Sequence, residues 1–238
     1  MHKKLKVFEL DIAKYVDYNP SYQFPKPLLP CIDGRVYQFG VSLTSLRLVG
    51  VNIMDDVVNY YLASCPNLEQ LCIRGSCLTK NLKFADPLPN LRVLEVSNCP
   101  KIQSLEISLT NLVSCTYQGS KDIFRFKEIP NLTELTLGGD FARSFIYEPK
   151  RHTSYSVQLV KLVLNNLIVD PYLRIHRPEL PRLGSLEHLE LNVMLPIGKS
   201  IHFFAKLINA SPLLKELTIK VSYISFLFFF ASLIVYIN

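Results

Sequence analysis

The stretch Pro89-Asn-Leu-Arg-Val-Leu-Glu-Val96 carries the pattern that decides the fold. Leu91, Leu94 and Val96 stand at positions 1, 4 and 6 of the motif Leu-x-x-Leu-x-Leu, which begins here at Leu91. Alternate residues of a β-strand point to opposite faces, so positions 4 and 6 face one side and positions 3 and 5 face the other. The motif therefore predicts a short strand with one buried face and one face in contact with solvent.

The same motif, with aliphatic or aromatic substitutions, recurs along almost the whole chain. Its copies begin at Leu5, Leu43, Leu68, Leu91, Leu112, Leu132, Leu159, Leu186 and Leu214. From the second copy onward the starts are spaced by 25, 23, 21, 20, 27, 27 and 28 residues, which is typical of leucine-rich repeats. One unit cannot bury its own leucines, whereas stacked units bury a continuous row. The spacing therefore predicts a curved α/β solenoid, with parallel strands on the concave face and helices or short extended segments outside.

Two kinds of outer segment are expected. Residues 55–64 and 200–209 each carry an apolar stripe at helical spacing, and each ends just before a proline that leads into a strand. A further match to the motif begins at Ile102, 11 residues after Leu91, and so short a unit cannot return along a strand and begin another. We therefore expect helices outside two units, and extended outer segments in the units that begin at Leu91 and Leu112.

The composition indicates a folded chain with much of its length buried. Of its 238 residues 49% are hydrophobic and 19% are charged, and the formal net charge is +6. A balance this mildly basic does not by itself point to nucleic acid or to an acidic membrane. No apolar run follows the basic N-terminus, so we expect no signal peptide, a cytoplasmic or nuclear location and reduced cysteines. The six cysteines show no zinc-ligand spacing.

Residues 221–238 form an atypical apolar tail after a predicted leucine-rich-repeat domain over residues 1–220. The tail has no charged residue and contains the run Phe226-Leu-Phe-Phe-Phe230. Its length reaches the lower limit of a membrane span. A membrane anchor and a buried end of the domain are both compatible with this composition, and contact with a membrane is expected only through this tail.

Five segments carry a more specific pattern. They are Tyr22–Pro25, Ser45–Gly50, Ser64–Leu71, Leu91–Pro100 and Ala210–Ile219. These segments resemble the plant F-box/leucine-rich-repeat proteins that have irregular, RNI-like repeats. The resemblance implies that the repeats bind a protein to be ubiquitinated, while an F-box docks a Skp-type adaptor of a cullin-type ubiquitin ligase. We find no F-box in this chain, so the resemblance covers the repeat region alone, and a Skp-type adaptor is expected only if an F-box lies upstream.

Motifs for catalysis are not found in the sequence. It has no glycine-rich phosphate loop, no nucleophile elbow and no His-Glu-x-x-His motif. His188 and Glu190 lie on one predicted strand face and could form an acid–base pair, but nothing nearby in the sequence completes a site. We therefore expect no enzyme, no cofactor and no bound metal.

The outward positions of the predicted strands are the candidate binding residues. They lean acidic, although the chain as a whole is basic. Their charged and titratable members are Glu9, Arg47, Glu95, Glu134, Lys161, His188, Glu190 and Glu216. We expect a protein with a basic or hydroxyl-rich surface to dock on this concave face, and reversal of Glu95, Glu134 and Glu190 to lysine to abolish or redirect its binding. A merely solvated strand face would carry similar residues.

A second candidate surface is the insertion Gly138–Gln158. It combines Phe145, Tyr147 and further aromatic side chains with basic residues, a composition typical of protein-binding hot spots. The same composition suits stacking on single-stranded nucleic acid, although we do not expect nucleic acid as a partner. We expect Phe145 and Tyr147 to contact a protein.

The interpretation that fits these observations best is a non-catalytic protein-interaction domain, resembling the substrate-recognition part of an F-box-type receptor. Two alternatives stay open at this point. One is a leucine-rich-repeat fragment of a disease-resistance-type receptor. The other is a membrane-tethered or truncated repeat product with no ligase role.

Overall fold

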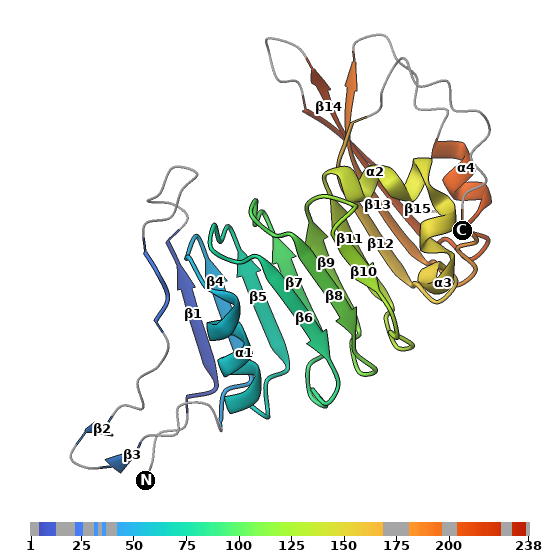
Figure 1. Cartoon of the computed structure of the whole chain (residues 1–238). Helices are drawn as coiled ribbons and strands as arrows, with labels where there is room; N and C mark the ends of the chain where they lie inside the picture. The colour runs from blue at the N-terminus through green and yellow to red at the C-terminus, as the bar shows by residue number, and fades with distance from the viewer. Residues whose placement is uncertain are drawn as a thin grey trace. The chain divides into compact units, whose positions relative to one another are not determined.

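The computed structural model describes residues 5–12, 22–25, 31–32, 35–36, 42–168, 181–196, 204–224 and 230–236. The chain, which Figure 1 shows coloured along the sequence, divides into two units. Unit 1 comprises Met1–Val113 and Asp122–Pro130, and unit 2 comprises Ser114–Lys121 and Asn131–Asn238. Each unit is an α/β assembly whose strands are mostly parallel.

Unit 1 combines a main sheet, an outer sheet and one helix. The main sheet has the order β1-β4-β5-β7 and the outer sheet the order β10-β8-β6, and both are parallel. The strands β2 and β3 form an antiparallel pair. The bounds are β1 Val7–Asp11, β2 Cys31–Ile32, β3 Arg35–Val36, β4 Ser45–Val49, α1 Asp55–Ser64, β5 Gln70–Arg74, β6 Asn81–Ala85, β7 Val93–Ser97, β8 Ser104–Ser108 and β10 Phe124–Phe126.

Unit 2 combines one sheet with several short helices. Its strands have the order β9-β11-β12-β13-β14-β15, parallel except for the antiparallel pair β14 and β15. The bounds are β9 Ser114–Gln118, β11 Glu134–Gly138, α2 Asp140–Tyr147, the 3-10 helix η2 Pro149–His152, α3 Thr153–Ser156, β12 Lys161–Ile168, β13 His188–Pro196, α4 Phe204–Asn209, β14 Glu216–Ile224 and β15 Phe230–Tyr236.

The strands of the main sheets confirm the repeat alignment. Each of the nine predicted strands begins two residues after the first leucine of its repeat. The register pairs equal positions of neighbouring repeats, as where Leu46 lies opposite Leu71 and Leu71 opposite Leu94. From Leu43 onward the residues at positions 1, 4 and 6 are all buried, and each such leucine contributes about 1.5–3 kcal/mol by leaving water. Phe8 and Leu10 are half-buried, because β1 has a single neighbour in its sheet.

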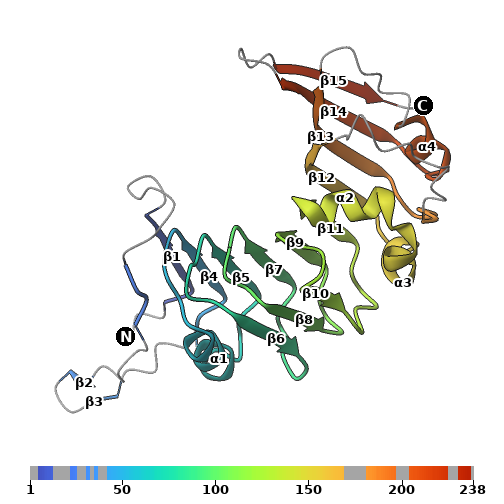
Figure 2. The same cartoon turned by 45° about the horizontal axis from the view of Figure 1, so that its top comes forward.

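The outer layer of unit 1 changes from a helix to strands along the chain. The helix α1, which Figure 2 shows beside the strands of unit 1, occupies the predicted range 55–64. It buries Val57 and Val58. The carboxylate of Asp55, in its first turn, accepts the backbone N–H groups of Lys80 at 2.8 Å and Asn81 at 3.0 Å, so it joins the start of the helix to β6. The strands β8 and β10 confirm the two extended outer segments. The strand β6 was not predicted.

Side-chain hydrogen bonds connect successive repeats of unit 1 at their starts. Asn90 Nδ2 donates to the carbonyl oxygen of Pro66 at 2.9 Å, and Asn111 Nδ2 donates to that of Pro89 at 2.9 Å. Asn90 and Asn111 directly precede the first leucines of their repeats, so each asparagine ties the beginning of one repeat to the beginning of the repeat before it.

The insertion Gly138–Gln158 is helical in unit 2. Gly139 has φ of +66° and precedes α2, so the chain leaves β11 through a conformation that favours glycine. The helix α2 buries Phe141, Phe145 and Ile146 and packs on β11 and β12. The helix predicted over 200–209 is observed as α4, and residues 200–203 lie outside the described residues.

The apolar tail continues the sheet of unit 2. The strand β14 passes residue 220 and ends at Ile224, and β15 pairs with it from Ser222 opposite Phe230 to Glu216 opposite Tyr236. Within the described part of the chain, no helix has the length and apolar character needed to cross a membrane. The described residues of the tail thus lie in strands.

Candidate protein-binding face

Alternation along the strands places positions 3, 5 and 7 of the repeats on the sheet face opposite to positions 4 and 6, and we call the surface formed there in each unit the ladder face. Most of its side chains reach solvent, whereas Val49 at position 7 of β4 is buried. In β4, for example, Ser45 and Arg47 are half-buried while Leu46 and Leu48 are buried. The residues predicted from positions 3 and 5 lie on this face. Position 7 adds charged residues that the sequence reasoning missed, because the motif ends at position 6 while the strands continue.

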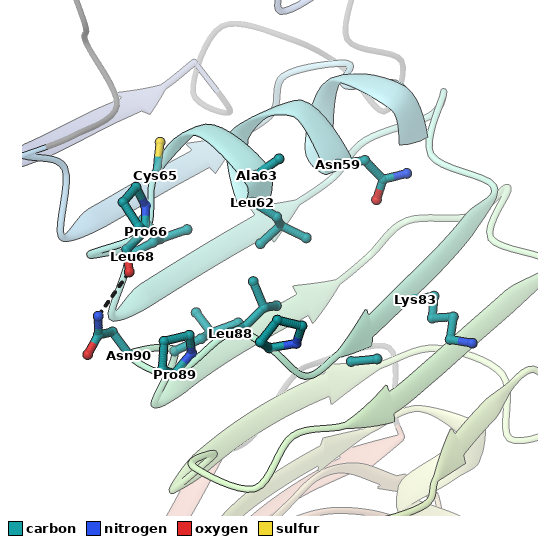
Figure 3. Close-up of a pocket in the computed structure, with 13 residues that line it drawn as sticks. Asn59, Leu62, Ala63, Cys65, Pro66, Leu68, Lys83, Leu88, Pro89 and Asn90 are labelled. Atoms are coloured by element: carbon teal, nitrogen blue, oxygen red, sulfur yellow. Dashed lines mark hydrogen bonds between the residues drawn. The ribbon is translucent and has the colours of Figure 1, made fainter.

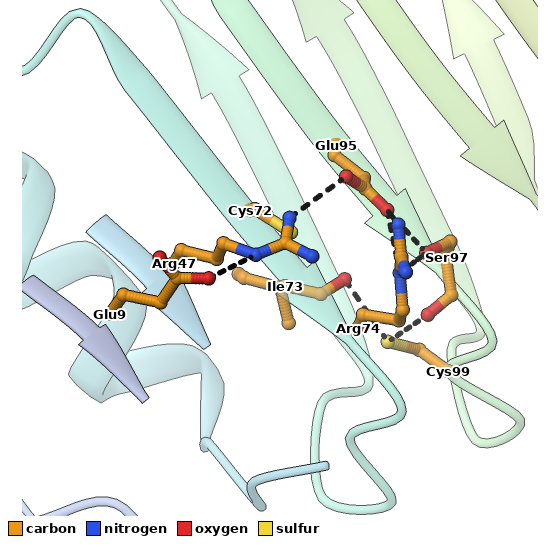
Figure 4. A network of polar contacts seen from close by, with 8 residues as sticks. All are labelled: Glu9, Arg47, Cys72, Ile73, Arg74, Glu95, Ser97 and Cys99. Carbon is orange, nitrogen blue, oxygen red and sulfur yellow. Dashed lines mark hydrogen bonds and ion pairs between the residues drawn. The ribbon is translucent and has the colours of Figure 1, made fainter. Parts of the chain in front are cut away.

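In unit 1 the charged side chains of the ladder face neutralise one another (Figure 4). Arg47 lies between two carboxylates, with its Nε 2.9 Å from Glu9 Oε1 and its Nη1 3.7 Å from Glu95 Oε2. The Oε1 atom of Glu95 accepts hydrogen bonds from Arg74 Nε at 2.8 Å and from Ser97 Oγ at 3.0 Å. Arg74 Nη2 also contacts this oxygen. One carboxylate therefore serves two arginines, and Glu9, Arg47 and Glu95 are brought together as a closed network.

The pKa values within this network follow from burial and pairing. Burial alone would raise the pKa of Glu95, but the hydrogen bonds from Arg74, Cys72 and Ser97 and the charge of Arg74 outweigh it and hold the pKa below its usual value. Burial, and then the adjacent Glu95 carboxylate, raise the pKa of Cys72 to about 12. The Cys72 thiol therefore stays protonated, and its sulfur accepts a hydrogen bond of 3.3 Å from Arg47 Nη1.

In unit 2 the ladder face is hollowed into an open pocket of about 500 Å³. The residues that line it are Glu134, Val160, Lys161, His188, Leu189, Glu190, Glu216 and Thr218. The register places position 3 of four successive strands side by side, in the order Glu134, Lys161, His188, Glu216. The five residues that the sequence predicted in this unit's strands therefore share one pocket.

Two acids of this pocket have partners. His188 Nδ1 lies 3.3 Å from Glu216 Oε2. Lys220 Nζ lies 2.5 Å from Glu190 Oε1, which also accepts a hydrogen bond of 3.1 Å from Asn192 Nδ2. Burial would raise the pKa of Glu190, but the hydrogen bonds from Lys220 and Asn192 and the charge of Lys220 lower it. Glu190 is therefore ionised, and its charge is balanced at position 7.

Glu134 differs from these acids. Its side chain is exposed, and the structure shows no hydrogen bond or ion pair to its carboxylate from any residue that it describes. Its neighbours in register are Ser114 on β9 and Lys161 on β12, yet the Lys161 ammonium group is not within ion-pair distance. The pocket lining carries three carboxylates and the ammonium group of Lys161, and Lys220 balances the carboxylate of Glu190, so the acids still outnumber the lysines by one. The pocket is therefore negative, and one of its acids is free to pair with a ligand.

The insertion that was expected to form an aromatic contact surface is instead part of the core. Phe145 is 0% exposed, so its prediction as a contact residue is wrong, because the apolar side of α2 packs against the sheet. Tyr147 is half-buried, and the guanidinium carbon of Arg143 lies 5.9 Å from the centre of its ring. A role for Tyr147 in binding stays a prediction.

Unit 2 contains a buried serine–histidine pair that no sequence motif indicates. Ser144 Oγ lies 3.0 Å from His152 Nε2, and His152 Nδ1 contacts the Tyr155 hydroxyl. The imidazole packs against the rings of Phe141 and Phe145, and its residue is 0% exposed. Burial is the main cause that lowers the pKa of His152 to about 4. The pair therefore joins α2 to the following helices within the core.

Comparison with known proteins agrees with the repeat architecture. No curated protein and no solved structure matches the chain. A sequence model for the family described as At1g61320/AtMIF1, LRR domain, matches residues 34–226. This match covers the strands from β4 to β14 that carry the leucine motif. Together with the parallel strands at leucine-rich-repeat spacing, it shows that the chain belongs to the At1g61320/AtMIF1 leucine-rich-repeat domain family.

Proposed function

We propose that this domain recognises a partner protein through the ladder face of unit 2, with the pocket around Glu134 as the centre of the contact. The observation that carries the proposal is the difference in pairing. The acids of the unit 1 network are held by Arg47 and Arg74, whereas Glu134 has no partner among the described residues. A partner does not need to break an existing ion pair to bind Glu134.

The pocket suits a lysine or arginine side chain of the partner. The apolar stem would lie along Val160 and Leu189, which line the pocket together with Thr218. The charged end would lie near the carboxylates of Glu134 and Glu216. An ion pair at such an exposed position contributes about 0.2–1 kcal/mol. The acids therefore influence which partner binds and how fast it associates more than how tightly it binds. Further contacts have to come from the rest of the ladder face.

We also propose that the bound protein is a substrate of a cullin-type ubiquitin ligase. The support comes from the resemblance of the repeats to plant F-box/leucine-rich-repeat proteins and from membership of a leucine-rich-repeat domain family. In this arrangement the repeats hold the target, and a Skp-type adaptor is held by an F-box outside them. Such an assembly would act in the cytoplasm or the nucleus.

The first experiment compares matched charge reversals in affinity capture from a plant extract, followed by calorimetry with the protein that is recovered. We expect Glu134→Lys to weaken its binding by about two- to thirtyfold, because the exposed ion pair is lost and a repulsion of similar size replaces it. Its melting temperature should fall only slightly, because the Glu134 carboxylate makes no contact that folding requires, while the new lysine lies opposite Lys161 in the register. The control is Glu128→Lys, which reverses an exposed acid outside the ladder face. Equal binding by both variants and the wild type would overturn the proposal.

The ligase role has a separate test. A genuine substrate should accumulate when the proteasome is inhibited, and it should co-purify with a Skp-type adaptor in a Glu134-dependent way. A protein that binds through Glu134 but shows neither behaviour would leave recognition intact and overturn the ubiquitin-ligase role.

A further inference from the structure

Unit 1 has a second pocket, which lies beside α1 and away from the ladder face (Figure 3). Its volume is about 350 Å³, and its walls come from the second half of α1, from β6 and from the segment that leads into β7. Three of its thirteen lining residues are polar: Asn59, Lys83 and Asn90. Leu62 of α1 and Leu88 approach it from two sides. The pocket is therefore mainly apolar, with a lysine at its margin.

The change of outer structure between two repeats explains why the pocket exists. A helix with its side chains is about 10 Å wide, whereas neighbouring strands are about 5 Å apart. The repeat outside β4 uses the helix α1, and the next repeat uses the strand β6, so a step is left between them. Ala63, Pro66, Pro87 and Pro89 are exposed at this step, and none of them has a polar side chain to bind water.

The adjacent outer sheet has an excess of positive charge. Lys83 and Arg125 both lie opposite Glu106 in the register of this sheet. Lys83 Nζ is 3.4 Å from Glu106 Oε1, and Lys127 Nζ is 2.9 Å from Glu106 Oε2. One carboxylate thus faces three cations, and the Lys83 side chain is 70% exposed. An acidic group next to the apolar pocket would complete this pairing.

We propose that the pocket binds an extended peptide segment of a partner protein, in which leucine or proline stands next to acidic residues. The apolar side chain would enter between Leu62 and Leu88, and the acids would reach Lys83, Arg125 and Lys127. This site is separate from the pocket around Glu134 and takes a ligand of opposite charge. It therefore goes beyond the proposed function and does not depend on it.

The test uses two fluorescein-labelled peptides, Glu-Glu-Leu-Pro-Leu-Glu-Glu and Lys-Lys-Leu-Pro-Leu-Lys-Lys, with the full chain in fluorescence anisotropy. The acidic peptide should bind, and added salt should weaken it because the charges are exposed. Lys83→Glu should weaken binding by about tenfold or more. The matched control is Lys101→Glu, which reverses an exposed lysine of the same unit that does not line the pocket. Equal binding of the two peptides, or equal loss in the two variants, would overturn the proposal.

A second variant separates insertion into the pocket from simple charge attraction. Ala63 is exposed on α1 and lines the pocket, so Ala63→Arg both fills the pocket and adds a positive charge. Insertion predicts weaker binding of the acidic peptide, whereas surface attraction alone predicts stronger binding and overturns the proposal. Self-association that disappears in Ala63→Arg would also overturn it, because a second copy would then be the occupant. Glu134→Lys should bind the acidic peptide as the wild type does, which keeps this test independent of the proposed function.

Discussion

Units 1 and 2 are built from the same repeat, but they use the charges of the ladder face differently. In unit 1 the carboxylate of Glu95 is shared by Arg47 and Arg74. Its pKa is lowered because the hydrogen bonds and the charge of Arg74 stabilise the ionised form. In unit 2 the carboxylate of Glu134 is exposed and has no partner among the residues that the structure describes. Position in the repeat determines which way a side chain points, whereas its neighbours in register determine whether it stabilises the fold or is available to a ligand.

The two units also differ in their outer layers. Unit 1 covers its core with α1 and a parallel sheet, and unit 2 covers its core with α2 and other short helices. The two units also differ in whether a titratable histidine is buried in their core. The core of unit 2 encloses His152 beneath α2, while the described residues of unit 1 include no histidine. The units should therefore respond differently to substitution and to pH.

The largest expected effect concerns the two outer layers. Phe84 of β6 and Phe145 of α2 are each 0% exposed. Phe84→Ala and Phe145→Ala should each lower the free energy of unfolding by about 3–5 kcal/mol, because each leaves a cavity and loses buried area. Urea unfolding followed by circular dichroism measures this, since the chain has no tryptophan for fluorescence. Unchanged stability of Phe145→Ala combined with lost partner binding would instead restore Phe145 as a contact residue.

The second prediction is a loss of stability in unit 2 in mild acid. The pKa of His152 is lowered by burial to about 4, whereas a histidine in an unfolded chain titrates near about 6.5. Between these values the unfolded state binds more protons, so stability falls as the pH decreases from about 6.5 to 4, by roughly 2–4 kcal/mol. The pKa of Glu95 in unit 1 is also lowered, but its contribution is lost only below the unfolded value of about 4.3.

Amide hydrogen exchange at pH 7 and pH 5 resolves this difference, because it reports on each unit separately. Protection should decrease in α2 and its neighbouring strands at pH 5 and change less in unit 1. His152→Gln should remove the pH dependence in this range, and His188→Gln, which alters a half-buried histidine of the ladder face, should retain it. An equal decrease in both units would contradict the assignment to His152.

The leucine spacing predicts the main sheets because the leucines of the motif are the residues that the strands bury. The strand β6 lies outside the leucine motif, and only Leu82 and Phe84 mark its buried face. The helix α2 does have a signal in the sequence, since Phe141 and Phe145 stand four residues apart and therefore on one helical face. The strand β15 pairs antiparallel with β14, and this pairing depends on contacts across the sheet rather than on a motif.

The candidate site was predictable in its residues but not in its pairing. The alternation of the strands identified Glu134, Glu190 and Glu216, and the register brings them to one pocket. Which of these acids lacks an ion pair depends on whether a lysine on another strand extends to within ion-pair distance of it. Lys220 reaches Glu190, whereas Lys161, directly opposite Glu134 in the register, forms no ion pair with it. Such distances are not encoded in the spacing of one repeat.

The smallest effects concern the starts of the repeats. Asn90 and Asn111 donate to carbonyl oxygens of the preceding repeat in unit 1. Asn90→Ala should therefore lower the free energy of unfolding by about 1 kcal/mol, the usual contribution of one such hydrogen bond. Thermal unfolding of this variant is compared with that of Asn59→Ala, which changes an exposed asparagine of α1. An equal change in both variants would show that the connection between repeats is not what stabilises unit 1.

The same hydrogen bond can be added to unit 2, where the repeats that begin at Leu186 and Leu214 lack asparagine at this place. Leu213 directly precedes Leu214 and is 56% exposed, so its replacement opens no cavity. By analogy with Asn90, an asparagine here would lie near the carbonyl group of Gly184, two residues before Leu186. Leu213→Asn should then be more stable than Leu213→Ala by about 0.5 kcal/mol or more. Equal stability of these two variants would mean that an asparagine at this place does not reach the carbonyl group of Gly184.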